Sequence, residues 1–468
     1  MLTTLAPVGS GSKNIKGASA YVWFIASVAA LGGLLFGYDW VVIGGARQFY
    51  EVWFQLGSGS QVGWANSCAL LGCLMGSMVS GYAADRFGRR PLLLLAGVLF
   101  GISSVATGWA FTFATFIFWR IAGGAAIGIA ANVSPIYIAE ISPAASRGRL
   151  VSLNQFAIVV GILLAQIVNA VIARNESGAD AAAAHAWNLA YGWRWMFCAV
   201  AVPSALFFAG SFFLPESPRW LIGRGQLRKA NTVLERIGGK EDALQESESI
   251  ARSLGDDQGT PAGWGEMLRP AVLPILLLAI AIAVLQQWTG INILFNYAAE
   301  VYRSAGYGSN QILLDVVITG SINLLATVLA MFLVDTIGRR RLMLFGCAGI
   351  GTSHLLCALA YHRHMQGLPI LALTLAAIAC YACTLAPVTW VFLSEIFPNR
   401  IRSRGMSIAG SSLWIASFLL TYTFPLMVAR FGIAGTFAMY GGVCFAGFLL
   451  VFRTMRETRG TSLEARKA

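Results

Sequence analysis

Two charged side chains stand in apolar stretches, where an ionised group is costly. Asp39 lies in LLFGYDWVVIGGA (34–46) and Arg120 lies in FWRIAGG (118–124). Burial favours the protonated form of a carboxyl group, whereas a nearby guanidinium favours the ionised form. Because both charges fall in the same half of the chain, we expect them to pair in a shared interior. Such a pair can act as a proton switch; the alternative is a static buried ion pair.

Amide side chains cluster in the second half of the chain. Gln286, Gln287 and Asn292 lie in QQWTGIN (286–292). Neutral donors and acceptors of this kind suit the hydroxyl groups of a sugar. The three residues do not share one stripe of a regular helix, so we expect a helix that is interrupted near TGIN. The alternative is that these amides hydrogen-bond between neighbouring helices.

Three further polar or aromatic residues fit a sugar site. Gln155 and Asn323 are isolated amides in apolar stretches, for which helix–helix adhesion is an equally good interpretation. Trp390 follows Pro387, which can kink a helix and present the indole ring as a platform for a sugar. Trp390 could also face lipid or the protein core.

Short charged motifs occur twice along the chain at nearly constant spacing, which indicates an internal duplication. The pairs are DRFGRR (85–90) with DTIGRR (335–340), EISPAASRGR (140–149) with EIFPNRIRSRG (395–405), and PESPR (215–219) with RETRG (456–460).

As shown below, the composition predicts a membrane protein with two repeated halves, and we expect the charges of these motifs to lie on one face of the membrane. Ion pairs between them could hold the two halves together in one conformation and break in another. The alternative is that the arginines only set orientation, but acids contribute little to orientation, so we favour gating. The expected gating charges are Asp85, Arg86, Arg89, Arg90, Glu140, Arg147, Glu216, Arg219, Asp335, Arg339, Arg340, Glu395 and Arg402.

The composition places these residues in a membrane protein. Of 468 residues, 57% are hydrophobic and only 12% are charged, and the mean hydropathy is +0.67. A span needs about 20 apolar residues, and lipid requires helices or closed barrels. We predict an all-α protein with twelve spans: 20–46, 61–84, 91–110, 111–139, 150–173, 193–214, 270–300, 311–334, 341–361, 369–396, 403–429 and 433–454.

The duplication divides the spans into two pseudo-symmetric six-helix bundles. The expected parts are an N-terminal segment (1–19), a first bundle (20–214), a linker (215–269), a second bundle (270–454) and a tail (455–468). The linker either forms short amphipathic helices or is a plain solvated segment. Two bundles around a central site suit alternating access, in which one half rocks against the other.

The net charge of +12 could suggest nucleic acid, but most basic residues fall in the segments on one side of the membrane. This positive-inside pattern places both termini in the cytoplasm. We expect a multi-pass protein of the cell membrane, which in a bacterium is the inner membrane, without a nucleic-acid partner. The cysteines and histidines suggest no disulfide framework, metal site, cofactor or enzyme centre.

Taken together, the motifs resemble the sugar porter family of the major facilitator superfamily, near bacterial pentose or hexose proton symporters and mammalian glucose facilitators. The resemblance spans about 20 to 465. The motifs that carry it are GYD (37–39), GYAADRFGRR (81–90), RIAGG (120–124), YIAEISP and SRGR (137–149), PESPRW (215–220), QQWTGIN (286–292), VDTIGRR (334–340), SEIFP (394–398) and RETRG (456–460).

The resemblance implies functional roles for particular residues. Positions matching Gln155, Gln286, Gln287, Asn292, Asn323 and Trp390 contact the sugar in that family, and the pair matching Asp39 and Arg120 couples protons. The chain departs from the family pattern at Asn296, where a tyrosine is common, at Ala386, where glycine is usual, and at Leu413, where an amide precedes the tryptophan that matches Trp414. We therefore add Asn296 and Trp414 to the expected sugar site.

The expected function is import of a pentose or hexose by alternating access, coupled to proton symport, by a protein that works as a monomer in the lipid bilayer. The alternative is a passive sugar facilitator. A transporter-like sugar receptor is a more distant alternative, because such proteins usually carry long cytoplasmic extensions.

Overall fold

The computed structural model describes residues 19–143, 146–176, 178–256, 264–397, 399–455 and 457. Most of the expected N-terminal segment (1–19) and tail (455–468) lies outside these residues. The described chain is built from helices, and it contains no strand. The all-α prediction is therefore confirmed.

The first six spans form a bundle that we call the N-terminal half. The sixth span is in pieces, because a π-helical turn (Asn188–Gly192) interrupts it. The helices are α1 (Ala20–Trp53), α2 (Gly59–Phe87), α3 (Arg89–Gly108), α4 (Phe113–Ile141), α5 (Arg147–Ile172), α6 (Ala181–Trp187), α7 (Trp193–Cys198) and α8 (Ala201–Ser211).

The remaining spans form the C-terminal half. The helix interruption expected near TGIN and the kink expected near Pro387 each fall close to a break in a helix. The seventh span is divided at Gly290, and the tenth is divided at Thr384. The helices are α12 (Leu273–Trp288), α13 (Ile291–Asn296), α14 (Ala298–Ser304), α15 (Ser309–Ile337), α16 (Arg339–His362), α17 (Leu368–Cys383), α18 (Leu385–Ile396) and α19 (Asn399–Thr454).

Eleven helices of the described chain are long and apolar enough to cross a membrane. The longest, Arg404–Thr454, has 51 residues and covers both of the last two expected spans. Gly432 within it has φ 69°, a backbone conformation that glycine adopts without steric cost. The chain reverses there, so α19 supplies two crossings and the predicted number of twelve agrees with the structure.

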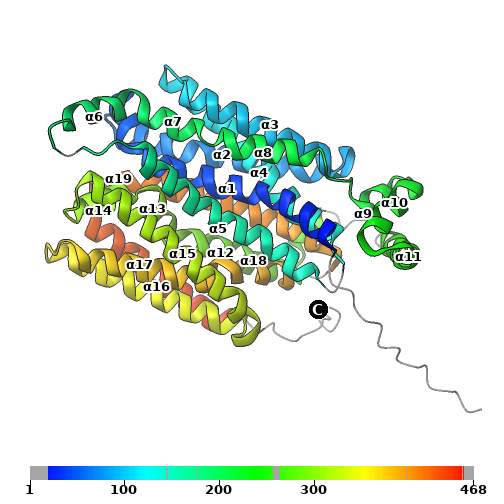
Figure 1. The fold of residues 1–468 in the computed structure, drawn as a ribbon. Coiled ribbons are helices and arrows are strands. Elements are labelled where there is room, and N and C mark those ends of the chain that lie inside the picture. Colours follow the sequence, from blue (N-terminus) through cyan, green and yellow to red (C-terminus); the bar gives the residue numbers. More distant parts are fainter. Residues whose placement is uncertain are drawn as a thin grey trace, which may run out of the picture.

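Between the halves, the linker folds into α9 (Pro218–Gly223), α10 (Leu227–Gly238) and α11 (Lys240–Asp256). Leu221, Ile222 and Ala230 form a small buried cluster that joins α9 to α10. These helices project from one end of the molecule, which we call the linker end (Figure 1). The other end, where α6 and α14 lie, is called the opposite end.

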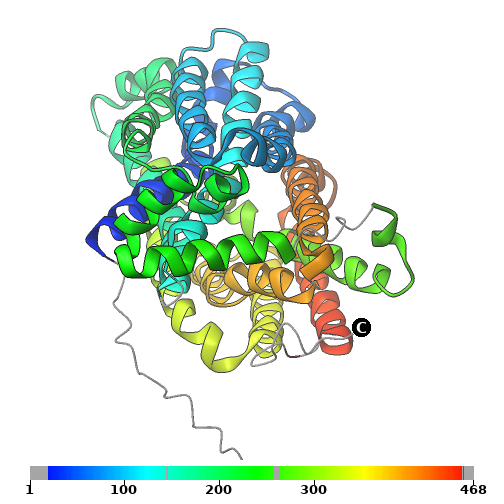
Figure 2. The same cartoon turned by 90° about the vertical axis from the view of Figure 1, so that its right-hand side faces the viewer.

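Figure 2, seen from the linker end, shows the N-terminal half beside the C-terminal half. Within the N-terminal half, α1 and α5 approach closely at two glycines. A Cβ atom on Gly37 would lie 1.9 Å from the carbonyl oxygen of Ile158, and one on Gly161 would lie 2.1 Å from that of Leu34. Small residues that let helix backbones meet are typical of membrane helix packing.

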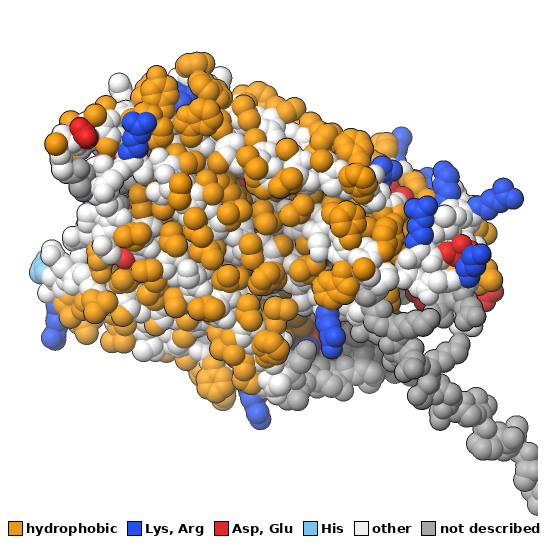
Figure 3. Space-filling model, viewed as in Figure 1, with side chains coloured by type: hydrophobic (Ala, Val, Ile, Leu, Met, Phe, Trp, Pro, Cys, Tyr) orange, Lys and Arg blue, Asp and Glu red, His pale blue; other side chains and the backbone are white. Residues whose placement is uncertain are grey.

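The outer surface agrees with a membrane-spanning protein. Hydrophobic side chains cover a broad band across the middle of the molecule, whereas Lys and Arg side chains gather toward its ends (Figure 3). Large hydrophobic side chains exposed on the spans include Phe118, Val171 and Phe332. Such a continuous apolar surface is unfavourable in water but suits contact with lipid.

Candidate functional site

Asp39 and Arg120 form the buried ion pair that the sequence predicts. Nη1 of Arg120 lies 2.8 Å from Oδ1 and 2.9 Å from Oδ2 of Asp39. The residues are only 4% and 3% exposed, and the Arg120 guanidinium also lies 5.3 Å from the centre of the Phe197 ring. Buried ions of this kind persist only when each partner compensates the other.

The Asp39–Arg120 pair borders a small cavity that reaches the C-terminal half. Its lining includes Asn66 of α2 and Asn296 of α13. Each of these asparagines has a buried side-chain oxygen without a hydrogen-bond partner. A buried acceptor left unpaired is unfavourable, and it is suited to a water molecule or a ligand hydroxyl. The cavity therefore connects the ion pair to the interrupted seventh span.

The amides of the seventh span form one connected chain of hydrogen bonds. Nε2 of Gln286 donates to the Tyr381 hydroxyl at 2.6 Å, and Nε2 of Gln287 donates to Oε1 of Gln286. Asn292 donates in turn to Gln287. Gly290 adopts a left-handed conformation with φ 79°, which ends α12 and lets α13 begin in a new direction. The predicted interruption near TGIN is therefore present, and it brings the three amides together.

The other expected site residues are less closely associated. Asn323 is buried in α15, and Gln155 is half-buried in α5. Trp414 is buried against α1, with its ring centre 5.9 Å from Phe36 and 6.3 Å from Trp40. Trp390 is 41% exposed on α18.

At the linker end, the charges of the N-terminal half form a network around Gly88. Arg89 forms a two-pronged ion pair with Glu140, with both N–O distances 3.0 Å. Glu216 accepts hydrogen bonds from the backbone N–H groups of Arg89 and Arg90. Burial raises the pKa of Glu216 above its usual value, and hydrogen bonds from Ser217, Arg89 and Arg90 oppose that shift. These bonds offset part of the cost of burying the carboxylate.

The C-terminal half repeats this arrangement around Gly338. Arg339 pairs with Glu395 at 3.3 Å, and Glu457 accepts from the backbone N–H groups of Arg339 and Arg340. Gly88 and Gly338 share a φ of 96°. The duplication seen in the sequence is therefore matched by equivalent contacts around Gly88 and Gly338 in the structure.

The networks around Gly88 and Gly338 differ from the expected gate in one respect. The ion pairs Arg89–Glu140, Arg89–Asp85 and Arg339–Glu395 each join helices of the same half. In this conformation the ion pairs stabilise each half internally. In the N-terminal half they hold the turn between α2 and α3 against α4, and in the C-terminal half they hold the turn between α15 and α16 against α18. A role between the halves in another conformation stays a prediction.

The other expected gating charges have diverse surroundings. Arg402 donates to the Phe397 carbonyl, Arg86 to the Tyr82 hydroxyl and Arg340 to the Phe452 carbonyl. Arg147 is exposed, and Arg219 is half-buried. The side chain of Asp335 lies outside the described part of the structure.

Contacts that the sequence did not predict join the two halves at the opposite end. Nη2 of Arg47 lies 2.8 Å from Oε2 of Glu300, and Nη2 of Arg303 lies 2.8 Å from Oε1 of Gln48. The Arg47 guanidinium also pairs with Glu51 and lies 4.3 Å from the centre of the Tyr297 ring. Helix α14 is thereby fastened to α1. The signal was present, since Arg47 and Glu300 are charges at the ends of apolar spans.

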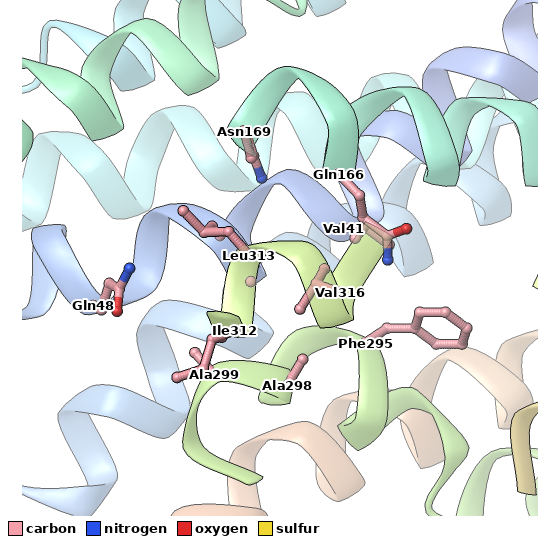
Figure 4. A pocket seen from close by; sticks show the side chains of 12 residues that line it. Val41, Gln48, Gln166, Asn169, Phe295, Ala298, Ala299, Ile312, Leu313 and Val316 are labelled. Carbon is pink, nitrogen blue, oxygen red and sulfur yellow. The ribbon is translucent and has the colours of Figure 1, made fainter. Parts of the chain in front are cut away.

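Close to these contacts lies a second small cavity between the halves (Figure 4). Gln166 of α5 borders it, is only 1% exposed, and has no hydrogen-bond partner at either amide atom. Its oxygen occupies space opposite Gly320 of α15, where a Cβ would lie 1.8 Å away. Asn169 lines the same cavity, and its amide donates to the Val42 carbonyl. Gln166 is a site candidate that the sequence did not single out.

Twelve spans in two repeated halves, with a buried ion pair in the first half and an amide cluster in the second, define a membrane transporter of the major facilitator type. Residues 25–467 match the sequence model of the family described as sugar (and other) transporter. The chain belongs to this sugar transporter family.

Individual relatives agree over the whole length. The D-xylose-proton symporter of Escherichia coli is 37% identical, with 97% of each chain covered. The glucose transport protein of Synechocystis is also 37% identical, over 96% of this chain and 97% of its own. Among solved structures, the xylose transporter XylE of E. coli in a partially occluded inward-open conformation is similar with a TM-score of 0.84, at 35% identity, over 95% of this chain and 100% of that chain.

Proposed function

We propose that the protein imports a monosaccharide, of the pentose or hexose class, together with protons by alternating access. The single observation that carries the coupling is the buried pair of Asp39 and Arg120 beside a cavity that reaches α13. A neutral, protonated Asp39 would lose its attraction to Arg120 and free the guanidinium to move. Protonation of Asp39 would therefore change how α1 packs near α13 of the seventh span, because the ion pair borders the same cavity as Asn296.

The sugar site that we propose lies between the halves. Its donors and acceptors are Gln155, Gln286, Gln287, Asn292, Asn296, Asn323 and Gln166, and its aromatic walls are Trp390 and Trp414. The amides match the hydroxyl groups of a sugar, and the indole rings match its apolar faces. Gln166 joins this set because its two unpaired amide atoms face a cavity between the halves.

The orientation that we propose places the linker end in the cytoplasm and the opposite end outside. Basic residues of the linker helices, such as Arg224, Arg228 and Lys229, agree with the positive-inside rule. The contacts of Arg47 with Glu300 and of Arg303 with Gln48 then close the external side. We further propose the domain limits 1–19, 20–214, 215–269, 270–454 and 455–468, both termini in the cytoplasm, and a working monomer in the bacterial inner membrane.

The test is sugar uptake into proteoliposomes with and without an imposed proton gradient, on a panel of pentoses and hexoses. Wild-type protein is expected to concentrate one of these sugars only when the gradient is present. Asp39→Asn removes the titratable group and is expected to abolish accumulation while exchange of sugar across the membrane continues. A variant that still concentrates sugar would contradict the role of Asp39.

The same assay tests the alternative of a passive facilitator. A facilitator equilibrates sugar at a rate that an imposed proton gradient does not change. Asp180→Asn, at an exposed acid of the opposite end, is a matched control and is expected to behave as wild type. Failure of every sugar to exchange would contradict sugar transport itself.

A further inference from the structure

A second carboxylate lies within a membrane span, and the coupling mechanism above does not use it. Asp315 is in α15, less than two turns from Ser309, where the helix begins at the opposite end of the molecule. It is 0% exposed. Ionisable residues within spans are rare and costly, so an intramembrane carboxylate calls for a functional explanation.

The surroundings of Asp315 leave its charge uncompensated. Nε2 of Gln311 donates to Oδ1 at 3.0 Å, whereas Oδ2 is buried without a hydrogen-bond partner. Within the described residues, no arginine, lysine or histidine lies within ion-pair distance of this carboxylate. One neutral amide cannot balance an ionised group in such a place. Asp39, with Arg120 at 2.8 Å, is in the contrasting situation.

The groups around Asp315 are polar but neutral. The Tyr302 hydroxyl of α14 contacts the hydroxyls of Thr319 on α15, at 3.0 Å, and Thr374 on α17, at 3.3 Å. Thr319 also donates to the Asp315 backbone carbonyl. Among the described residues, the titratable groups around Asp315 and Tyr302 are Tyr302 itself, Tyr307 and, from α16, Cys357 and Tyr361.

Helix α14 connects this cluster to the closure of the opposite end. One side of the helix carries Glu300 and Arg303, which bond to Arg47 and Gln48 of α1. Another side carries Tyr302, which packs toward the Asp315 cluster. In this conformation, in which α14 is fastened to α1, Asp315 is fully buried.

We propose that Asp315 is a second proton-binding site, which takes up a proton from the external side when that side closes and returns it there when the side opens. The proposal rests on the orientation given under the proposed function. With its proton, Oδ2 becomes a hydroxyl and the carboxyl group is neutral, so burial behind α14 no longer isolates a charge. Because Asp315 lies near the external end of α15 and is 0% exposed in this externally closed conformation, the proposal has its proton return to the outside when that side opens.

The direction in which pH changes the closure equilibrium follows from how many protons each conformation binds at Asp315. The externally closed conformation holds one more proton at Asp315 than the open conformation does. Closure therefore becomes less favourable as external pH rises, by up to about tenfold per pH unit while the site loses its proton. Asp315→Asn is neutral at every pH, so closure of this variant loses that dependence.

Infrared spectroscopy of the purified, full-length protein tests the bound proton directly, because a protonated carboxylic acid has a carbonyl band distinct from that of a carboxylate. We expect such a band near neutral pH in wild type and in Asp39→Asn, and its absence in Asp315→Asn. It should disappear as the pH is raised, because the externally open conformation then holds the ionised form. A spectrum in which Asp315→Asn removes no such band overturns the proposal, as does a band that never titrates.

The dependence of sugar exchange on external pH tests whether the proton at Asp315 controls closure of the external side. Sugar exchange by Asp39→Asn should slow at least about fivefold between external pH 6 and 8, whereas Asp39→Asn/Asp315→Asn should slow less than about twofold. Asp39→Asn/Asp180→Asn is the matched control and should retain the dependence. Equal slowing in both double variants overturns the proposal.

Proton uptake on addition of sugar distinguishes this proposal from the proposed symport. Asp315→Asn should take up as many protons per sugar as wild type, because the proton at Asp315 returns to the outside. A loss of proton uptake in this variant would mean that Asp315 carries the transported proton, which contradicts the proposal. If wild type itself takes up no protons with sugar, the symport fails, while the infrared band still decides the fate of Asp315.

Discussion

Arg47 of α1 and Glu300 of α14 join the two halves of the protein at the opposite end, with 2.8 Å between Nη2 and Oε2. The pair lies over Tyr297, whose ring centre is 4.3 Å from the Arg47 guanidinium and whose hydroxyl donates to the Thr421 carbonyl. A charged contact between the two halves can stabilise one conformation and be broken in another without disrupting the hydrophobic core of either half.

Removal of either partner should weaken the closed state of this end. We expect Arg47→Ala and Glu300→Ala to slow sugar exchange, with a coupling of about 1 kcal/mol between the two substitutions in a double-mutant cycle. Arg47→Ala should cost more, because it also loses Glu51 and Tyr297. Arg430→Ala, at an exposed arginine of the same end, is the control. Strictly additive effects would show that the Arg47–Glu300 contact does not contribute to closure.

The buried pair of Asp39 and Arg120 makes a prediction about stability. Arg120→Ala leaves the Asp39 carboxylate buried and without its partner, so we expect a loss of about 3–5 kcal/mol in the free energy of unfolding. Thermal unfolding in detergent measures this loss. Asp39→Asn/Arg120→Gln removes both charges and should recover most of the stability. If Arg120→Ala unfolds at the wild-type temperature, Asp39 is compensated by something other than the guanidinium.

The amide chain of the seventh span should govern sugar affinity. Gln287→Ala removes the residue that links Gln286 to Asn292, so the site loses about 1–3 kcal/mol of hydrogen bonding to sugar. The KM of uptake is expected to rise about fivefold to a hundredfold with little change in protein stability. Gln245→Ala, at an exposed amide of α11, is the control. An unchanged KM would place the sugar elsewhere.

The turn between α2 and α3 should tolerate only glycine. Gly88 has φ 96°, and a Cβ there would lie 2.3 Å from Oε2 of Glu216. We expect Gly88→Ala to destabilise the N-terminal half by about 1–3 kcal/mol. Gly81→Ala in α2, where a Cβ meets no atom within 4 Å, should leave the unfolding temperature unchanged or raise it. Similar losses in both variants would mean that the helix, rather than the turn, is sensitive.

The sequence by itself determined most of the architecture. Apolar runs of about 20 residues can be satisfied only as helices in lipid. The repeated DRFGRR and DTIGRR motifs indicated the duplication, and the structure shows Glu216 and Glu457 binding equivalent backbone groups. The pairing of Asp39 with Arg120 was also predictable, because an isolated charge in a span must find a partner.

Only the tertiary structure decided which side chains meet across the interface between the halves. Arg47 pairs with Glu300, and Gln166 lies against Gly320, at separations in the chain that no local pattern encodes. The motif charges could equally have joined the halves at the linker end, but in this conformation Arg89–Glu140 and Arg339–Glu395 stay within them. Asp315 was overlooked because one acid hardly lowers the hydropathy of a span, whereas its cost depends on whether a cation lies nearby in space.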